Sequence, residues 1–263
     1  MVYTCFEMIR DCRENRAQGW SYFIQNYVPV IQKLIEHYRP GLGTELNQVL
    51  VGICSAQSNM FAGMEPLPER PFLAELRQQV LEVLDRLRPQ PAPDISIDFE
   101  TLSAAVEGLT LLEKQAVWFE TMLYGPAEAG PLLRTAPTTI EKIREKAAER
   151  IRAKADGWRV SVLAENGRQL GREASAGTPE CLSQKAFLDV IDGRANWRGR
   201  EDLERHVSGC WHCIDHFCRM LEVVGLLRQI QPLTEAEAES FRQLLGLASA
   251  EKQPVWKRLF GAG

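Results

Sequence analysis

The residues with the clearest capacity for chemistry lie close together in the C-terminal third of the sequence. Four of the seven cysteines and three of the four histidines fall between positions 181 and 218. Among them, His206, Cys210 and Cys213 form a His-x3-Cys-x2-Cys run. Two cysteines at this spacing can turn both sulfurs toward one point where a helix begins, and the histidine lies one helical turn back on the same face. Thiolate and imidazole groups are the ligands that Zn²⁺ prefers in closed structural sites.

A closed zinc site needs four ligands, and this run supplies three of them. The fourth should come from a separate element, so that the metal ties two pieces of chain together. Cys181 is the natural candidate, and His212, His216 and Cys218 are its rivals. Such cysteines can also be buried, inert thiols or a redox-active thiol pair. We predict a structural zinc site made of Cys181, His206, Cys210 and Cys213.

The sequence carries no motif that is typical of a catalytic centre. A catalytic zinc keeps an open position beside a carboxylate base, as in a His-Glu-x-x-His helix, and the sequence contains no such run. It has no glycine-rich phosphate loop and no serine nucleophile elbow. The Cys-x2-Cys pair does not follow a strand of a βαβ unit, which argues against thioredoxin-like chemistry. We therefore predict that the chain is not an enzyme.

Composition places the chain among ordinary globular proteins. Hydrophobic residues make up 45% of the 263 residues and charged residues 25%, and the formal net charge is -4. A basic surface over the whole chain is excluded, so any nucleic-acid contact must come from a local patch. The apolar stretches are interrupted by charges, and the N-terminus does not resemble a signal peptide. We expect a soluble, cytoplasmic protein with no membrane contact, and the odd number of cysteines argues against a disulfide framework.

The elements that must position these side chains are predicted to be helices. Apolar residues recur at three- and four-residue steps, which is typical of amphipathic helices. The predicted helices lie at 20–38, 45–57, 71–87, 100–108, 111–123, 127–133 and 138–154. The alternating run 159–163 followed by Asn166-Gly167 predicts a short β-hairpin. The expected fold class is an all-α, multi-domain protein.

Breaks in composition divide the chain into parts. Alternating prolines at 88–94 favour an extended linker, and the glycine-containing stretch at 167–179 is typical of a connector. The predicted parts are a helical domain at 1–90, a linker at 91–100, a second helical domain at 101–157, a connector with the hairpin at 158–178, the zinc-binding module at 179–231 and a helical tail at 232–263.

A local basic patch accompanies the last helix of the middle domain. Between positions 134 and 159 there are eight basic and four acidic residues, a local balance of +4. In a helix-turn-helix, the start of the second helix meets base edges and later basic residues meet phosphates. Thr138, Thr139, Lys142 and Arg144 are then the candidate DNA-binding residues. The same charge spacing is also typical of a solvated, salt-bridged helix face.

Two parts of the chain resemble bacterial protein families. Cys181, together with the run from His206 to Cys213, is similar to the zinc-binding motif of zinc-containing anti-sigma factors, and this resemblance covers residues 180–231. The segments 20–38 and 71–76 resemble the polymerase-binding and promoter-melting helices of an extracytoplasmic-function sigma factor. The segment 101–154 resembles the helix-turn-helix domain of such a factor, with 139–152 in the place of the recognition helix.

This resemblance implies a transcription regulator in which a sigma-like part is fused to a zinc module of the anti-sigma type. It implies RNA polymerase or a sigma-like protein as partner, contact with promoter DNA, and an intramolecular contact between the zinc module and the sigma-like domains. The implied zinc is structural and, in some members, redox-responsive. The alternative is a zinc-dependent protein–protein interaction protein that does not bind DNA.

Overall fold

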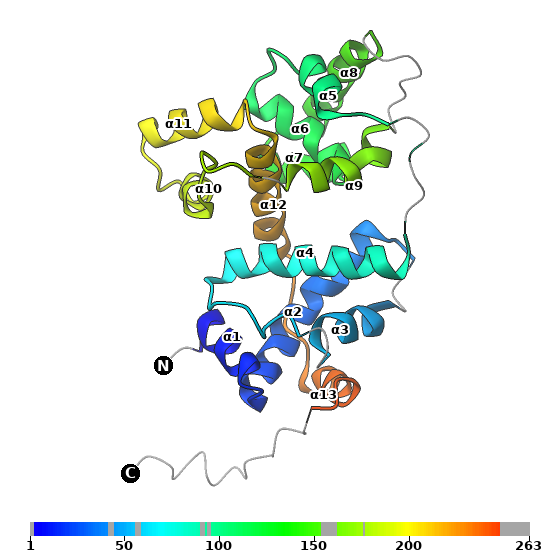
Figure 1. The fold of residues 1–263 in the computed structure, drawn as a ribbon, viewed down its shortest axis with the longest axis vertical. Coiled ribbons are helices and arrows are strands. Elements are labelled where there is room, and N and C mark those ends of the chain that lie inside the picture. The colour runs from blue at the N-terminus through cyan, green and yellow to red at the C-terminus, as the bar shows by residue number, and fades with distance from the viewer. Residues whose placement is uncertain are drawn as a thin grey trace. The chain divides into compact units, whose positions relative to one another are not determined.

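The chain folds into helices throughout the part that the computed structural model describes, which is residues 3–41, 45–55, 59–89, 93, 96–153, 162–175 and 177–247. No strand occurs in these ranges. Two compact units are present: unit 1 is Met1–Arg88 with Gln229–Gly263, and unit 2 is Pro89–Arg228 (Figure 1). None of the described helices is both long and apolar enough to cross a membrane. The predicted all-α, multi-domain class is confirmed.

Unit 1 is built around one long helix, α2 (Ala17–Tyr38). The helices α1 (Cys5–Arg13), α3 (Leu46–Cys54) and α4 (Glu69–Leu87) pack on it. The apolar residues of α2 recur at helical spacing along its length, and its middle, Tyr27–Ile31, is buried on every side. Phe23 contacts Phe61 with ring centroids 5.2 Å apart, and Tyr27 contacts Phe72 at 5.0 Å. An aromatic cluster therefore forms the core of this unit.

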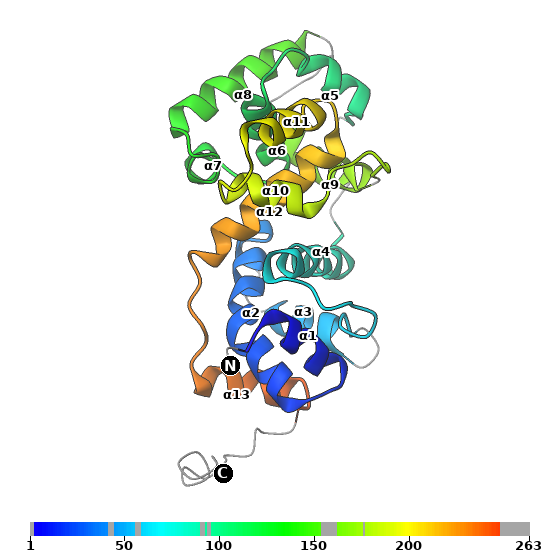
Figure 2. The ribbon, with the colours of Figure 1, turned by 90° about the vertical axis from the view of Figure 1, so that its left-hand side faces the viewer.

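Two elements of unit 1 come from the ends of its sequence. The helix α1 is not among the predicted helices. It begins with a capping box in which the backbone N–H of Thr4 donates to the Glu7 carboxylate at 2.6 Å. The helix α13 (Glu235–Leu244) belongs to the predicted tail and packs on α2 (Figure 2). The backbone N–H of Leu233 donates to the Gln25 carbonyl at 2.8 Å. A C-terminal segment thus completes the first unit.

Unit 2 contains the remaining helices of the described chain. These are α5 (Phe99–Ala105), α6 (Leu111–Thr121), α7 (Pro126–Leu133), α8 (Pro137–Arg152), α9 (Val162–Ala174), α10 (Gln184–Ile191), α11 (Trp197–Val207) and α12 (Trp211–Leu227). The central helix is α6, which contacts α7, α8, α9 and α12. Its residues Trp118 and Phe119 are fully buried. The helices of the middle segment and those of the candidate metal centre therefore share one core.

The β-hairpin predicted around Asn166-Gly167 is wrong in its described part, because Val162–Ala174 forms the helix α9. Asn166 is fully buried, and its side-chain oxygen accepts a hydrogen bond from the backbone N–H of Ile97 at 3.0 Å. Gly167 lets α9 approach α6 closely, since a Cβ at this position would lie 2.0 Å from the Thr121 carbonyl oxygen. The Asn-Gly pair therefore serves helix packing and not a turn.

The two compact units do not coincide with the parts that the sequence predicts. The middle segment 101–157 and most of the zinc module lie in unit 2, and the tail helix lies in unit 1. Most of the proline-rich stretch, residues 154–161 and residues 248–263 fall outside the described residues. The linker, the start of the connector and the end of the tail stay predictions.

Candidate metal centre

The four predicted ligands converge in unit 2. The ligand atoms of Cys181, His206, Cys210 and Cys213 all lie within 4.8 Å of one another. The sulfurs of Cys181 and Cys210 are 3.7 Å apart, and Nε2 of His206 is 3.2 Å from the sulfur of Cys213. Two sulfurs that each lie about 2.3 Å from one tetrahedral zinc ion are separated by about 3.8 Å. The cluster can therefore hold one metal ion.

Three separate pieces of the chain carry these ligands. Cys181 lies in the loop before α10, and His206 lies near the end of α11. Cys210 is the N-cap of α12, with φ -128° and ψ 107°, and Cys213 is in the first turn of that helix. Cys210 thus lies at the boundary of α12, and Cys213 lies within the helix. A bound metal would join the loop before α10 to the junction of α11 and α12.

The thiols of the cluster differ in how readily they ionise. The side chain and backbone N–H of Thr178 hydrogen-bond to the sulfur of Cys181, with the N–H at 3.2 Å, and these bonds lower the pKa of Cys181 to about 6. Burial raises the pKa of Cys213 to about 12. Metal ions bind thiolates and release the thiol proton. Cys181 thus offers a thiolate near neutral pH, whereas Cys213 would gain one when a cation binds beside it.

The rival ligands identified in the sequence have other surroundings. Nδ1 of His212 lies 2.8 Å from the carbonyl oxygen of Ala174, and its ring stacks on that of His216. His216 contacts Phe187 with ring centroids 5.3 Å apart. Cys218 is fully buried in α12. Within the described residues, none of the three rivals belongs to the metal-binding cluster.

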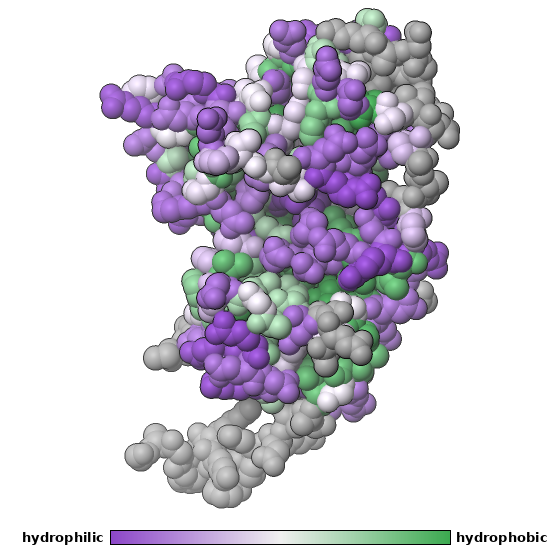
Figure 3. All heavy atoms as spheres, in the orientation of Figure 1, coloured by the Kyte–Doolittle hydropathy of each residue, from purple (hydrophilic) through white to green (hydrophobic). Residues whose placement is uncertain are grey.

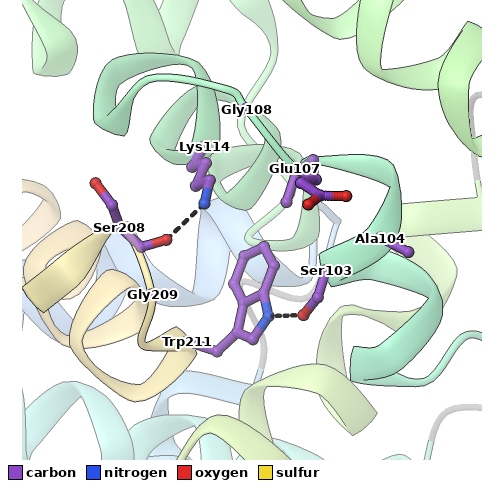
Figure 4. A pocket seen from close by; sticks show the side chains of 9 residues that line it. Ser103, Ala104, Glu107, Gly108, Lys114, Ser208, Gly209 and Trp211 are labelled. Carbon is purple, nitrogen blue, oxygen red and sulfur yellow. Dashed lines mark hydrogen bonds between the residues drawn. The ribbon is translucent and has the colours of Figure 1, made fainter. Parts of the chain in front are cut away.

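The loop between α11 and α12 is fastened to α5 and α6. Nζ of Lys114 donates to the Ser208 carbonyl at 2.5 Å, and the indole nitrogen of Trp211 donates to the Ser103 hydroxyl at 2.7 Å (Figure 4). Trp211 also stacks on Phe99, with ring centroids 5.8 Å apart. A pocket of about 390 Å³ opens between these groups. The sequence does not predict these contacts, because neither Trp211 nor Lys114 belongs to a recognisable motif.

Two buried hydrogen bonds join α12 to α6 and to the segment between α6 and α7. The indole nitrogen of Trp118 donates to Oδ1 of Asp215 at 3.1 Å, and the hydroxyl of Tyr124 donates to Oε1 of Glu222 at 2.8 Å. Arg219 forms an ion pair with Asp215 at 2.8 Å. Buried carboxylates are costly unless they are paired and hydrogen-bonded. These bonds therefore fix the position of α12 against its neighbours.

Three of the four candidate DNA-binding residues lie on the surface. Thr138, Thr139 and Lys142 are exposed in the first turns of α8. A turn of three residues, 134–136, connects α7 to α8, and the two helices pack on each other. The described chain therefore contains a helix, a short turn and a second helix whose beginning is accessible.

Three other basic side chains of α8 contact the protein itself. Arg144 is only 10% exposed and forms an ion pair with Glu120 at 3.6 Å. Lys146 pairs with Glu113 at 3.0 Å, and Arg150 donates to a backbone carbonyl at 3.0 Å. Burial removes Arg144 from the candidate DNA-binding residues. The local charge balance overestimated the basic surface, because it could not show which cations have internal partners.

The chain matches no family model, no curated protein and no solved structure. The donor atoms of the candidate metal centre indicate which kind of metal site it can form. Three sulfurs and one nitrogen fill a tetrahedral coordination sphere, which is the arrangement of a closed structural site. Such a site leaves no coordination position open for a substrate.

Proposed function

We propose that the chain binds one structural Zn²⁺ ion and regulates transcription through protein contacts, as a sigma-like protein joined to a zinc module of the anti-sigma type. The convergence of three sulfurs and one imidazole nitrogen within 4.8 Å carries the metal assignment. The resemblance of the ligand run to zinc-containing anti-sigma factors supports the partner class. RNA polymerase or a sigma-like protein is the proposed partner.

The proposed role of zinc is to hold α10 and α11, which have little apolar burial of their own. Phe187 is the buried residue of α10, and Leu203 and Val207 are the buried residues of α11. Metal bonds contribute directly to folding where a small module cannot bury enough apolar surface. We expect metal removal to loosen α10 and α11 before the helices α5 to α9.

The zinc-bearing helices would restrain the helix pair α7 and α8 from within unit 2. The packing of α12 on α6, α7 and α9 supports this role, and so does the packing of α8 on α6 and α7. Gly225 of α12 lies against Leu132 of α7, where a Cβ would come within 2.3 Å of a Leu132 methyl carbon. Changes at the metal centre would reach the α7–α8 pair through this contact.

Metal content is the first test of the proposal. The purified full chain should contain one zinc per molecule by elemental analysis, and Cys210→Ser should lose it. Cys54→Ala is the matched control, since Cys54 is a buried thiol of α3 outside the cluster. Retention of zinc by Cys210→Ser, or its absence from the unchanged protein, would refute the metal assignment.

The partner class needs a separate measurement. Binding of the zinc-loaded chain to purified bacterial core RNA polymerase can be followed by surface-immobilised interferometry. We expect saturable binding by the unchanged protein and weaker binding by Cys210→Ser. If the zinc-loaded chain does not bind polymerase or a purified sigma factor, the partner assignment is wrong while the metal assignment remains.

Direct DNA binding is a second candidate function, favoured by the accessible start of α8. A labelled duplex pool of random sequence would report it by fluorescence anisotropy at two salt concentrations, because phosphate contacts weaken steeply with salt. Lys142→Glu should reduce binding about tenfold, as expected for a lost and reversed phosphate contact. Lys185→Glu, a charge reversal at the exposed start of α10, is the control. Salt-insensitive or absent binding would favour the interaction protein that does not contact DNA.

A further inference from the structure

Trp197 is the most exposed large apolar side chain in the described part of the chain, at 68%. The next most exposed is Phe6, at 47%. Trp197 is the first residue of α11, and the helix start is fixed by the Asn196 side chain, which accepts from the backbone N–H of Gly199 at 2.9 Å. Tryptophan gains more than most residues from burial and is enriched at the centres of protein interfaces. Its position on a defined helix start therefore indicates a contact surface.

Two arginines lie beside this tryptophan at the start of α11. The guanidinium carbon of Arg198 lies 5.3 Å from the Trp197 ring centroid. Arg200 donates to the backbone carbonyl of Ala195 at 3.2 Å. Within the described residues neither guanidinium forms an ion pair, whereas Arg205 on the same helix pairs with Asp202 at 3.1 Å. The start of a helix also carries a partial positive charge. Two guanidinium groups therefore lie beside the indole at this end of α11, while the carboxylates of Glu201 and Asp202, which follow along the helix, pair with Arg205.

We propose that Trp197, Arg198 and Arg200, here called the Trp197 patch, form a docking surface for an acidic segment of a partner protein. The indole would supply the apolar contact, and the two guanidinium groups would bind carboxylates through charge-assisted hydrogen bonds. The inference rests on the proposed function only for the role of zinc in holding α11.

A protein segment fits the Trp197 patch better than a nucleic acid does. Glu201 and Asp202 follow the patch directly along α11, and Asp189 and Asp192 are paired with Arg194 just before it. A phosphate backbone that continued past the patch would meet these carboxylates. On the face of the molecule that Figure 3 shows, hydrophilic residues dominate the surface over α11. A short acidic segment needs only the patch itself.

The metal centre is expected to control how the Trp197 patch is presented. His206, near the end of α11, belongs to the candidate metal site. The helix otherwise relies on two buried apolar residues, Leu203 and Val207. Removal of the metal should therefore let α11 move and weaken docking without changing the patch residues.

Binding of a labelled acidic peptide to the zinc-loaded full chain tests the inference. The probe is a short glutamate- and aspartate-rich peptide with two leucines, and its counterpart carries lysine at every acidic position. Fluorescence anisotropy at near-physiological salt should show saturable binding of the acidic peptide alone. Trp197→Ala and Arg198→Glu should each weaken it about tenfold, the effect of losing a central contact. Phe6→Ala and Arg13→Glu, both in α1, are matched controls and should bind as the unchanged protein does.

Three results would overturn the docking surface: no binding of the acidic peptide, equal binding of the lysine peptide or of single-stranded DNA, or full binding by Trp197→Ala. Unchanged circular dichroism of the variants would exclude loss of folding as the cause of a lost contact. If the protein as purified contains no zinc and still binds the peptide through Trp197, the proposed metal is refuted and the docking surface is supported. Zinc-loaded protein that binds equally well with and without Trp197 would refute the docking surface alone.

Discussion

The indole nitrogen of Trp118 on α6 lies 3.1 Å from Oδ1 of Asp215 on α12, in a buried hydrogen bond between residues 97 positions apart. Arg219, one turn further along α12, supplies the counter-charge to the same carboxylate at 2.8 Å. The helix that begins at the candidate metal centre is therefore tied to the central helix of unit 2 by a buried, charged group. The stability of unit 2 should depend on this group more than on any surface ion pair.

We expect Asp215→Ala to lower the free energy of unfolding by about 3 kcal/mol, because the substitution removes the buried carboxylate that both Trp118 and Arg219 contact. Asp202→Ala is the control, since this carboxylate is 67% exposed in its pair with Arg205. Exposed pairs contribute at most about 1 kcal/mol. Urea unfolding followed by circular dichroism measures both. Equal losses in the two variants would contradict the role assigned to Asp215.

Two glycines of α9 should respond to alanine in opposite directions. Gly167→Ala places a Cβ 2.0 Å from the Thr121 carbonyl oxygen, so the two helices must separate. We expect a loss of about 2 kcal/mol or more, as is typical of overpacking against a backbone. Gly171→Ala meets no atom of the described chain within 4 Å and should stabilise the helix by about 0.5–1 kcal/mol. Thermal unfolding midpoints that shift the same way in both variants would show that α9 does not pack as described.

Acid should destabilise unit 2 through His216. Burial lowers the pKa of His216 to about 4, Asp215 opposes the shift, and His212 and Arg219 add to it. Its Nε2 is buried and has no hydrogen-bond partner among the described residues. The unfolded imidazole, with a pKa near 6.5, then binds a proton more readily than the folded one. The free energy of unfolding is therefore expected to fall as the pH drops from 6.5 toward 4, by on the order of 3 kcal/mol.

The substitution His216→Phe isolates this effect, because the phenyl ring keeps the contact with Phe187 and cannot be protonated. Above pH 6.5, the difference between the free energies of unfolding of the two proteins should not depend on pH. Below pH 6.5, the free energy of unfolding of the unchanged protein should fall more steeply than that of His216→Phe. A difference that does not change with pH would mean that His216 titrates normally in the folded chain.

The choice of ligands can be tested within α12 alone. Cys218→Ala should keep the metal, since the buried sulfur of Cys218 lies outside the cluster, while Cys213→Ser should lose it. Zinc released by a mild denaturant can be measured with a chromogenic chelator. Loss of zinc from Cys218→Ala with the fold intact would move the ligand assignment to a rival residue.

The sequence predicted those features that repeat with the helical period or follow from fixed ligand spacing. Amphipathic helices bury one face, so their apolar residues recur every three or four positions, as Ile140, Ile143 and Ala147 do in α8. The ligand run places three donors within eight residues, and a closed zinc site then requires a fourth from elsewhere. For this reason, the spacing of the donors was enough to favour Cys181 over its rivals.

The features that the sequence did not predict depend on contacts between distant segments. Asn166-Gly167 has the composition of a turn, but the buried contacts of this pair with Ile97 and Thr121 place it inside a helix. Arg144 lies among exposed charges in the sequence, yet it turns toward Glu120 on another helix. Local propensity carries no information about either partner.

The closure of unit 1 by α13 has a consequence for synthesis. The ribosome must translate all of Pro89–Arg228 after α4 before the segment that packs on α2 emerges. At about 5–20 residues per second, this delay lasts roughly 7–30 s. The N-terminal helices should wait through it as an incomplete nascent chain, open to chaperones and proteases, while unit 2 can fold as soon as its own residues leave the exit tunnel.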